Sequence, residues 1–483
     1  MHTKVLAAAA RQLRRLPLAK WSFQNAQRRG LVQPSYNYRH IRDNADTLLK
    51  NAQQRNVLDA QPHLVGKLYD QFRHLQTQVN ERRAELNTLS KQLAVQARNK
   101  QADTAGLRKQ AADIKAMIQQ IEKQASEVEA QMRVEASKLP NDTHVDTPLG
   151  DESQARTVRV HGRLHEAGEK IPGSQAEFRD HYDLALSLGL VDMEAGARVA
   201  GSRFHFWRGS GALLELALVQ YAMGRAVAAG FEPHITPDIA RSSVVDACGF
   251  RARDAASQIY GVAPVAEGEA AVTAAAAADP LCLVATAEIA LTGMHQQQTL
   301  GANELPQRMA GLSHCFRAEA GARGRDTRGI YRLHQFTKVE LVTLCAPGQG
   351  DIELERLVNL QSSLYADLGL TFRVLQMPTH ELGASAFQKY DIEAWMPGRR
   401  MWGEVSSASN CTDYQARRLG IRARREGGVE FVHTLNATAV AVPRLAVAIL
   451  ETHQRADGSV VVPEVLRPWM LGRDVLKPTS GAQ

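Results

Sequence analysis

The sequence predicts an α+β fold in which a long antiparallel helical hairpin, a coiled coil, precedes a domain built on an antiparallel β-sheet. The first observation is a leucine-rich heptad pattern over about residues 64–139. The second is that, from about residue 150, short β-rich runs alternate with helical stretches. Heptads pair helices, and such a mixture is typical of helices packed on an antiparallel sheet. A chain of 483 residues is long enough for two or more domains.

Residues 1–30 form a basic leader. The first 42 residues contain nine Lys and Arg side chains and no acid, whereas the rest of the chain holds 49 basic against 51 acidic side chains. Arg recurs between Leu residues, which is typical of a mitochondrial transit peptide and not of a secretory signal. The alternative is a basic arm that binds nucleic acid directly. We expect removal of the leader near Arg28–Gly30, which would leave a mature chain of balanced charge in the mitochondrial matrix.

Composition excludes several classes of protein. No run of about 18 apolar residues occurs, so we expect no membrane span and no membrane partner. The five cysteines lie at least 30 residues apart, which excludes a C-x-x-C metal site and a dense disulfide framework. The phosphate-binding pattern G-x-x-x-x-G-K-[ST] is also absent, so a P-loop nucleotide site is not expected.

The heptad pattern consists of two segments. Apolar side chains recur at alternating spacings of four and three over residues 68–93 and again over residues 107–139. The polar break at 98–106 is short, so the two helices should be antiparallel. Each helix of about 30 residues would be about 45 Å long, and Pro140 should end the second one. These helices form the core of a predicted arm at residues 31–145.

The half of the hairpin nearest its tip is basic. Its basic residues are Arg82, Arg83, Lys91, Arg98, Lys100, Arg108, Lys109 and Lys115. Three interpretations fit: a solvated helical surface, a finger that binds nucleic-acid phosphates, or a coiled coil that dimerises.

Residues 146–475 carry the mixed α and β pattern. The runs RTVRVHG, FVHTLN and SVVVPEVL predict strands, and GALLELALVQYAMGRAVAAG predicts a helix. The Ala-rich segment 266–280 is of low complexity and is interpreted as a surface insertion. The tail at 476–483 is expected to be flexible.

Three features of this region predict a nucleotide site. Segment 316–340 concentrates Arg side chains, whose planar donors suit a polyphosphate. Glu404, Ser406 and Ser407 lie on a predicted strand, and a carboxylate beside phosphates suggests Mg²⁺. Arg444 stands alone at the start of an apolar helix. Together they predict an ATP site that activates a substrate at the α-phosphate; the alternatives are a solvated charged loop and a surface charge at a helix end.

These residues resemble a known family. FRAE (316–319) is similar to motif 2 of the class II aminoacyl-tRNA synthetases, and AVPR (441–444) is similar to motif 3. SNCTDYQARR (409–418) and DIEAWMPGR (391–399) resemble seryl-tRNA synthetases in particular, and LPNDTHVDTPLGDESQAR (139–156) resembles the mitochondrial type. The resemblance implies that residues 146–475 form a class II catalytic domain on an antiparallel β-sheet.

The resemblance also implies an activity and its residues. Serine and ATP would form seryl-adenylate, and the seryl group would pass to mitochondrial serine tRNA. The implied catalytic residues are Arg317, Glu404 and Arg444. The implied ATP-binding residues are Arg317, Ala318, Glu319, Leu333, Phe336, Glu404, Val405, Ser406, Ser407 and Arg444. The implied serine-binding residues are Thr286, Ala287, Glu288, Arg317, Glu340, Asn436 and Thr438. Mg²⁺ would bind Glu404 and Ser407.

Individual roles follow from the same resemblance. Arg317 would bridge the α-phosphate and the serine carboxylate, and Arg444 would pair with the γ-phosphate. Glu319 would hold the adenine amino group while Phe336 stacks on the ring. Thr286 and Glu288 would receive the serine ammonium group, and Glu340 and Thr438 would bind the hydroxyl. Positioning and charge stabilisation would then carry the reaction without a side-chain nucleophile.

The arm and the assembly also have implied roles. In this family the arm contacts the long variable arm of serine tRNA, here through Arg82, Arg83, Lys91, Arg98, Lys100, Arg108 and Lys109. The family is homodimeric, and the region around Gly201–Arg203 and Pro237 resembles the motif that forms the interface. The alternative function is a catalytically inactive paralogue that binds tRNA or serves as a structural protein. The presence of Arg317, Glu319, Glu404 and Arg444 favours the active enzyme.

Overall fold

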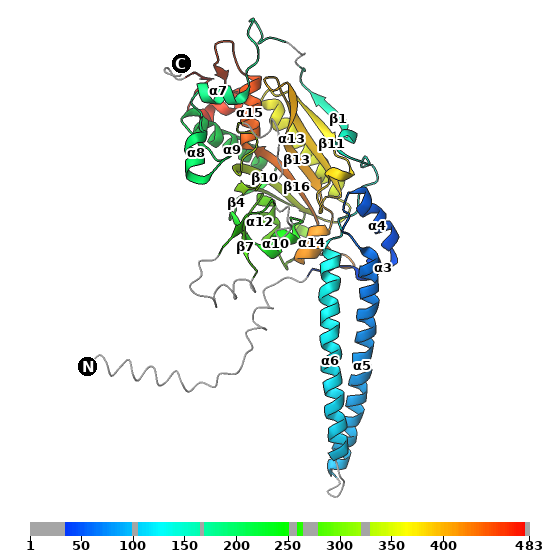
Figure 1. Cartoon of the computed structure of the whole chain (residues 1–483). Helices are drawn as coiled ribbons and strands as arrows, with labels where there is room; N and C mark the ends of the chain where they lie inside the picture. Colours follow the sequence, from blue (N-terminus) through cyan, green and yellow to red (C-terminus); the bar gives the residue numbers. More distant parts are fainter. Residues whose placement is uncertain are drawn as a thin grey trace, which may run out of the picture.

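The computed structural model describes residues 34–98, 105–164, 169–250, 258–263, 279–319 and 329–478. A helical hairpin projects from a domain that contains a large sheet (Figure 1). The helices are α3 (Tyr38–Asp43), α4 (Ala45–Gln54), α5 (Pro62–Arg98), α6 (Ala105–Ser137), α7 (His181–Ser187), α8 (Met193–Ala200), α9 (Ser210–Ala228), α10 (Ser242–Ala247), α12 (Ala287–Gly293), α13 (Gly350–Asp367), α14 (Tyr414–Leu419) and α15 (Val442–Thr452).

The main sheet has the strand order β1-β11-β12-β13-β16-β10-β9-β4. Its strands are β1 (Arg156–His161), β4 (Glu232–Ile235), β9 (Gln307–Phe316), β10 (Gln335–Cys345), β11 (Phe372–Gln376), β12 (Gln388–Met396), β13 (Met401–Asn410) and β16 (His433–Ala441). Neighbours are antiparallel except β4 and β9, which are parallel. Short strands form smaller sheets: β2 (Val191–Asp192), β3 (Phe206–Trp207), β5 (Ile239–Arg241), β6 (Gly261–Val262), β7 (Leu281–Leu283), β8 (Thr299–Leu300), β14 (Arg422–Arg425), β15 (Gly428–Phe431), β17 (Val460–Val461) and β18 (Val475–Leu476).

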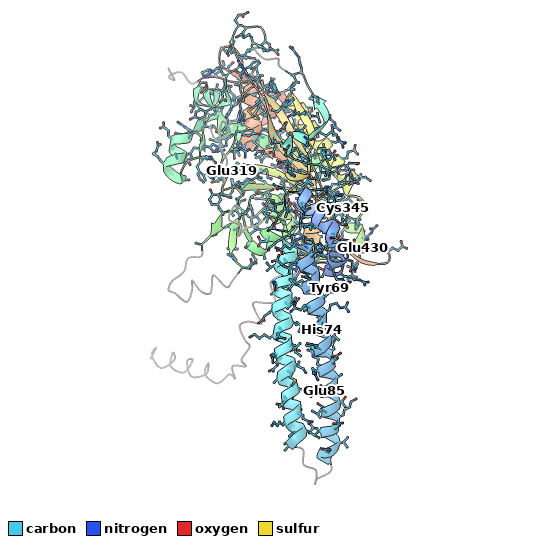
Figure 2. All side chains as sticks on the ribbon, turned by 45° about the vertical axis from the view of Figure 1, so that its right-hand side comes forward. Tyr69, His74, Glu85, Glu319, Cys345 and Glu430 are labelled. Carbon is cyan, nitrogen blue, oxygen red and sulfur yellow. The ribbon has the colours of Figure 1, made fainter. Side chains whose placement is uncertain are left out.

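The predicted helical hairpin is confirmed. Helix α5 has 37 residues and α6 has 33, and Figure 2 shows Tyr69, His74 and Glu85 spaced along α5 from the base toward the tip. The heptad side chains bury one another between the helices. A cluster far from the domain consists of Val79, Leu89, Ile114 and Ile118. The seam therefore stabilises the hairpin along its length, as the heptads predict.

The base of the hairpin is fixed to the sheet domain by buried hydrogen bonds to main-chain oxygens. Arg55, which is only 3% exposed, donates to Asn141 O at 2.7 Å and to Gly383 O at 2.6 Å. The Asn141 amide in turn donates to Ser385 O and Cys411 O, each at 2.9 Å. Burial lowers the pKa of Arg55 to about 10. Because these donors are buried, breaking the joint would leave unpaired polar groups, and the arm base and domain therefore form one unit.

The two faces of the main sheet have different surroundings. Along β10, Val339 and Leu341 point into a core that also contains side chains of α9, α13 and α15. Glu340 and Val342 point to the other face, where Val342 packs with residues of α10, α12 and α14. This period of two is what an extended strand dictates. The second face is only partly roofed by helices, and it carries the polar residues of the site.

Four expectations of the sequence need comment. In the predicted strand SVVVPEVL only Val460–Val461 is a strand, and residues 464–470 form a 3₁₀ helix with Pro468 inside it, because prolines cannot donate to a β ladder. The Ala-rich insertion lies almost wholly outside the described residues. None of the described helices is both long and apolar enough to cross a membrane. All five cysteines, which lie within the described residues, are buried and outside any disulfide.

Candidate active site

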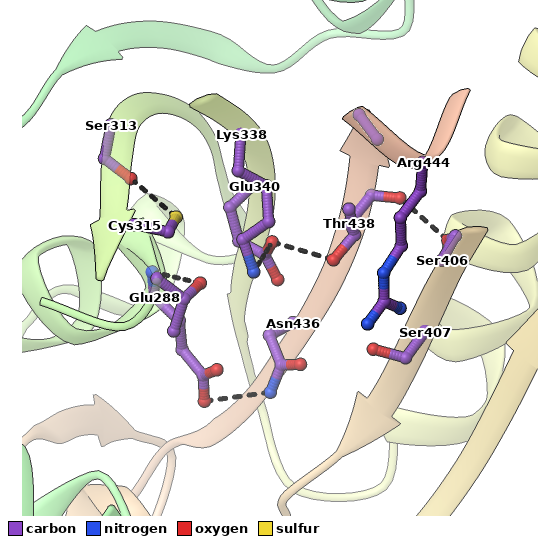
Figure 3. A network of polar contacts seen from close by, with 12 residues as sticks. Glu288, Ser313, Cys315, Lys338, Glu340, Ser406, Ser407, Asn436, Thr438 and Arg444 are labelled. Carbon is purple, nitrogen blue, oxygen red and sulfur yellow. Dashed lines mark hydrogen bonds and ion pairs between the residues drawn. The ribbon is translucent and has the colours of Figure 1, made fainter. Parts of the chain in front are cut away.

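Most of the predicted site residues belong to β10, β13, β16, α12 and α15 or directly follow β9, and these elements meet on the partly covered face of the sheet. Strands β9, β10, β13 and β16 supply the floor, while α12 and α15 supply residues from their first turns (Figure 3). One pocket on this face is lined by Arg317, Glu319, Tyr331, Arg332, Leu333, Phe336, Ala441, Pro443 and Arg444. Segments far apart in the sequence therefore converge on one surface.

Arg444 and Glu404 form an ion pair at one end of the site. Arg444 stands in the first turn of α15 behind Pro443, and its Nη1 lies 2.9 Å from Glu404 Oε1. Its guanidinium carbon lies 5.2 Å from the centre of the Tyr331 ring, and the Tyr331 hydroxyl donates to Glu404 O at 2.8 Å. The arginine is thus held by both charge and an aromatic face.

The charges around Glu404 keep it ionised. Removal of water from the carboxyl would raise its pKa, but Arg444, Lys389 and Arg317 together lower the pKa to about 2. The side chain nevertheless keeps 41% of its surface exposed, so it remains reachable from solvent. An ionised, accessible carboxylate is the oxygen ligand that Mg²⁺ prefers.

A bulge in β13 decides which of its side chains face the site. The register with β12 shifts beside Val405, so Val405 and Ser406 both point toward α13. Val405 is fully buried in the core, and Gln361 of α13 donates to the Ser406 hydroxyl. Glu404, which pairs with Arg444, and Ser407 consequently share the site face although they are three residues apart. Re-aiming a side chain is a known effect of a bulge, and the sequence alone gave no sign of it.

Arg317, Glu319 and Phe336 lie together at the other side of the pocket. The Arg317 guanidinium carbon lies 5.3 Å from the centre of the Phe336 ring. Arg332 contacts Glu319 with an Nη1–Oε2 distance of 3.3 Å. Glu319 has a φ of +47°, a left-handed conformation that costs a non-glycine residue energy. The backbone strain here aims the Glu319 carboxylate into the pocket.

A buried charge cluster occupies the floor beside this pocket. The Glu340 carboxylate is 2% exposed and contacts Lys338 Nζ at 2.6 Å. The Thr438 hydroxyl also donates to Glu340 Oε2, at 3.0 Å (Figure 3). A buried carboxylate needs such donors, because leaving it unpaired would be costly. Glu340 and Thr438 therefore form a preset polar contact opposite one another on β10 and β16.

Glu288 is a second buried carboxylate, in the first turn of α12. Its Oε1 accepts from Gln415 Nε2 at 2.7 Å and from Asn436 Nδ2 at 3.0 Å. The Thr286 hydroxyl caps the helix by accepting from Glu288 N at 3.3 Å. Burial and the nearby Glu340 raise the pKa of Glu288 to about 7, although Gln415 opposes them. Two carboxylates in one buried region attract cations: Lys338 supplies one at Glu340, and Glu288 could accept a second one, such as an ammonium group.

The remaining predicted residues have mainly structural positions. Ala287 is fully buried where α12 approaches β9, and the Ala318 main-chain N–H donates to Gln258 O at 2.9 Å. Sequence reasoning did not assign a role to Lys338, Tyr331, Arg332 or Gln415. All four lie within the motif segments, but which of them face the site depends on strand register and helix packing.

The basic residues of the arm are at its surface. Arg82 pairs with Glu85 at 2.7 Å and Arg83 pairs with Glu122 at 2.6 Å. Three further predicted tRNA-binding residues are exposed, namely Lys91, Arg108 and Lys109. The side chain of Arg98 and the whole of Lys100 lie outside the described residues.

One further group of potential metal ligands occurs among the described residues. Asp180, His181 and Glu451 bring three ligand atoms within 4.8 Å of one another. However, Glu451 already accepts from the His181 and Arg399 main-chain N–H groups at 3.1 and 3.0 Å. The cluster therefore works as a clamp between α15, α7 and the β12–β13 turn, and its geometry needs no ion.

Comparison with known proteins connects the arm and the sheet domain to one family. The seryl-tRNA synthetase N-terminal domain model matches residues 36–143, and the tRNA synthetase class II core domain model (G, H, P, S and T) matches residues 273–453. The serine–tRNA ligase of Rubrobacter xylanophilus is 42% identical over 91% of this chain and 98% of its own length. The mitochondrial serine–tRNA ligase of Mus musculus is 39% identical over 85% of this chain and 78% of its own.

Solved structures agree with the sequence relatives. The seryl-tRNA synthetase from Pyrococcus horikoshii complexed with ATP superposes with a TM-score of 0.80 at 32% identity, covering 92% of this chain and 100% of that one. The cytoplasmic serine–tRNA ligase from Naegleria fowleri in complex with AMP gives a TM-score of 0.75 at 28% identity, covering 92% and 96%. The similarity thus extends over both the hairpin and the sheet domain.

Proposed function

The chain belongs to the seryl-tRNA synthetases, class II enzymes that attach serine to tRNA with ATP, and we propose how its own residues divide that work. The observation that carries the proposal is one polar surface with a basic end and an acidic end. Arg317 and Arg444 line the pocket at the basic end, while Glu288 and Glu340 are buried beside it. ATP phosphates suit the first end, and the ammonium and hydroxyl groups of serine suit the second.

In this proposal, adenylate formation depends on the two arginines. Arg317 bridges the α-phosphate and the serine carboxylate, so that it neutralises charge where the new bond forms. Arg444 exchanges its partner Glu404 for the γ-phosphate when ATP binds. Phe336, whose ring already lies beside the Arg317 guanidinium, stacks on the adenine ring. Glu319 accepts a hydrogen bond from the adenine amino group. Positioning and electrostatics suffice, because serine supplies its own carboxylate nucleophile, which bonds to the α-phosphorus as the bond from that phosphorus to pyrophosphate breaks.

Serine selection falls to the two carboxylates. Glu288, with Thr286 beside it, accepts the ammonium group. Glu340 and Thr438 bind the hydroxyl, and Asn436 holds Glu288 in position through its 3.0 Å hydrogen bond. Alanine would leave the buried Glu340–Thr438 pair without its polar partner, so the pocket rejects it more strongly than lost contact area alone would.

The metal in this proposal is Mg²⁺ at Glu404 and Ser407. Both offer hard oxygen atoms, and the low pKa of Glu404 keeps its carboxylate ionised at neutral pH. When bound, the ion would supply positive charge to the phosphates of ATP. The residues Ser406 and Val405 point to the other side of the sheet, so their contribution to ATP binding is limited to main-chain atoms.

We also propose that the arm grips serine tRNA and that the enzyme is a homodimer. Exposed Lys91, Arg108 and Lys109 offer positive charge to phosphates. Exposed apolar side chains on the side of α8, α9 and β4 support a second copy as partner: Val199 is 74% exposed and Ile235 is 87% exposed. Sedimentation velocity of the purified chain tests the dimer, because a monomer at micromolar concentration would contradict it.

The mitochondrial matrix is the proposed location. Its support is the acid-free leader together with a mouse mitochondrial relative, although a bacterial relative is equally similar. Fusion of residues 1–30 to a fluorescent protein tests the leader: mitochondrial fluorescence is expected, and diffuse cytosolic fluorescence would overturn this part.

Serine-dependent exchange between pyrophosphate and ATP tests the proposed chemistry with the full chain. Exchange is expected with serine and Mg²⁺ and not with alanine. ATP binding without serine-dependent exchange would instead favour the inactive paralogue. That alternative has no support from the site itself, since Arg317, Glu319, Glu404 and Arg444 are all present and adjacent.

A further inference from the structure

Gln415 is a buried polar side chain to which the proposed function assigns no role. It lies on α14, next to the serine end of the site, and is 1% exposed. Its Nε2 donates to Glu288 Oε1 at 2.7 Å and to Cys248 O at 3.0 Å. Its Oε1 accepts from the Thr434 hydroxyl at 2.7 Å. Both ends of the amide are thus used.

These partners allow only one orientation of the amide. If it turned over, its oxygen would face the Glu288 carboxylate and the Cys248 carbonyl, which are both acceptors. Thr434, which is fully buried, supplies the proton that the amide oxygen receives. Gln415 is therefore fixed as a donor toward Glu288, and it cannot act as an acceptor there.

The helix that carries Gln415 is itself held in place. The main-chain oxygen of Arg417 accepts from Ser35 N at 2.9 Å, and the Arg418 guanidinium carbon lies 3.3 Å from the centre of the Tyr414 ring. Arg418 is 7% exposed and donates to Tyr414 O at 3.0 Å. A donor on such a fixed helix loses little entropy when it orients its acceptor.

We propose that Gln415 is a positioning residue for serine binding: its locked amide holds the Glu288 carboxylate ready to accept the substrate ammonium group. The proposal rests on the function proposed above, in which Glu288 receives that ammonium. Gln415 does not touch serine in this arrangement. It acts through Glu288, and its loss should affect serine far more than ATP.

The charges around Glu288 explain why a neutral donor matters. The charged and titratable groups that face it are Glu340 and Lys338 of β10, Arg317 after β9, Cys248 after α10 and Cys411 before α14. Burial and Glu340 raise the pKa of Glu288 to about 7, whereas the Gln415 hydrogen bond lowers it. Without that bond the carboxyl should be protonated at neutral pH, and a protonated carboxyl cannot hold an ammonium group by charge.

The test compares Gln415→Leu with the unchanged full chain in serine-dependent ATP–pyrophosphate exchange at pH 6.5 to 8.5. At pH 7 the KM for serine should rise about tenfold to a hundredfold, as expected when a hydrogen bond to a charged group is lost. The KM for ATP should change by less than about threefold, because Gln415 is remote from the ATP pocket. The KM for serine should then fall toward that of the unchanged chain as the pH rises, because Glu288 regains its charge.

Thr434→Val is the matched control. It removes one buried hydrogen bond from the same network but leaves both donors on Glu288, so its effect on the KM for serine should be the smaller one. If Gln415→Leu does not fold, Gln415→Met, which keeps the length of the side chain, takes its place. Failure of both to fold would overturn the proposal, because the amide would then be a structural element only.

The outcomes separate this inference from the proposed function. No serine-dependent exchange by the unchanged chain would overturn both. Normal exchange with an unchanged KM for serine in Gln415→Leu would overturn the role of Gln415 alone. A rise in KM that is equal for serine and ATP, or that does not diminish at higher pH, would also overturn it.

Discussion

Replacement of Thr438 by Val tests the proposed recognition of the serine hydroxyl. The two side chains have nearly the same shape, so the change removes a hydroxyl without opening a cavity. In the structure that hydroxyl donates to Glu340 Oε2 at 3.0 Å, and Glu340 is 2% exposed. The variant would leave Lys338, at 2.6 Å, as the contact that remains for this carboxylate.

The expected magnitude follows from the charge on Glu340. A hydrogen bond to a charged group contributes about 1.5–3 kcal/mol, and each 1.4 kcal/mol corresponds to about tenfold in rate or affinity. The value of kcat/KM for serine should therefore fall by about tenfold to a hundredfold or slightly more. Activation of alanine, which makes no use of the hydroxyl contact, should change little. The preference for serine over alanine should then fall by the same factor.

The assay is amino-acid-dependent ATP–pyrophosphate exchange with each amino acid, and Thr438→Ser is the control because it retains the hydroxyl. The decisive number is the ratio of kcat/KM for serine to that for alanine. General loss of structure would lower both values and leave the ratio unchanged. A ratio in Thr438→Val that equals the ratio in the unchanged chain would refute hydroxyl recognition by the Glu340–Thr438 pair.

Three further predictions use other parts of the molecule. The pKa of Glu288 rises to about 7 on folding, so its proton stabilises the folded chain fully below about pH 4.5, and this stabilisation is lost as the pH rises through 7. The melting temperature without substrate should therefore fall less from pH 5 to pH 8 in Glu288→Gln than in the unchanged chain, and parallel curves would contradict this. Reversal of charge at Arg108 and Lys109 should weaken tRNA binding and reduce its salt dependence, while pyrophosphate exchange stays unchanged. Equal loss of tRNA binding and of exchange would argue against separate roles for the arm and the sheet domain. Gly329 has a φ of +81°, and a Cβ there would overlap His181 Nε2. Gly329→Ala should therefore lower the free energy of unfolding by about 1–3 kcal/mol, measured by denaturant unfolding, and an unchanged midpoint would contradict that close approach.

The hairpin could be predicted from sequence because its stabilising contacts repeat locally. Each apolar position three or four residues from the last lies on the same face of its helix, so the seam from Val79 to Ile118 can be read without knowledge of the rest of the fold. The helix ends were less accurate: α5 already begins at Pro62, a residue that suits a first turn. The heptads mark the seam, whereas the helix boundaries also depend on contacts at the base.

The site could be predicted only as far as motifs reach. The neighbours of Arg317 and Arg444 are distinctive enough to predict a site at both, and both line one pocket, but the opposite orientations of Ser406 and Ser407 could not be predicted. Those orientations depend on the shift of register between β12 and β13, a tertiary feature that no local pattern encodes. The same applies to Gln415, whose partner Glu288 is 127 residues away in the chain. Contacts between residues so far apart in the chain can be identified only when the strands and helices have been placed in space.

The electrostatics of the site link its two ends through Arg317. This residue lowers the pKa of Glu404 at the proposed phosphate end and also that of Glu288 at the proposed serine end. Serine is a zwitterion, so a site that binds it needs one positive and one negative group a short distance apart, and Arg317 with Glu288 satisfies that need. The serine carboxylate would then lie against the same guanidinium as the α-phosphate, and the two anions that must react would share one cation. Loss of Arg317 should consequently impair serine binding, ATP binding and the transition state together, whereas loss of Arg444 should impair ATP alone.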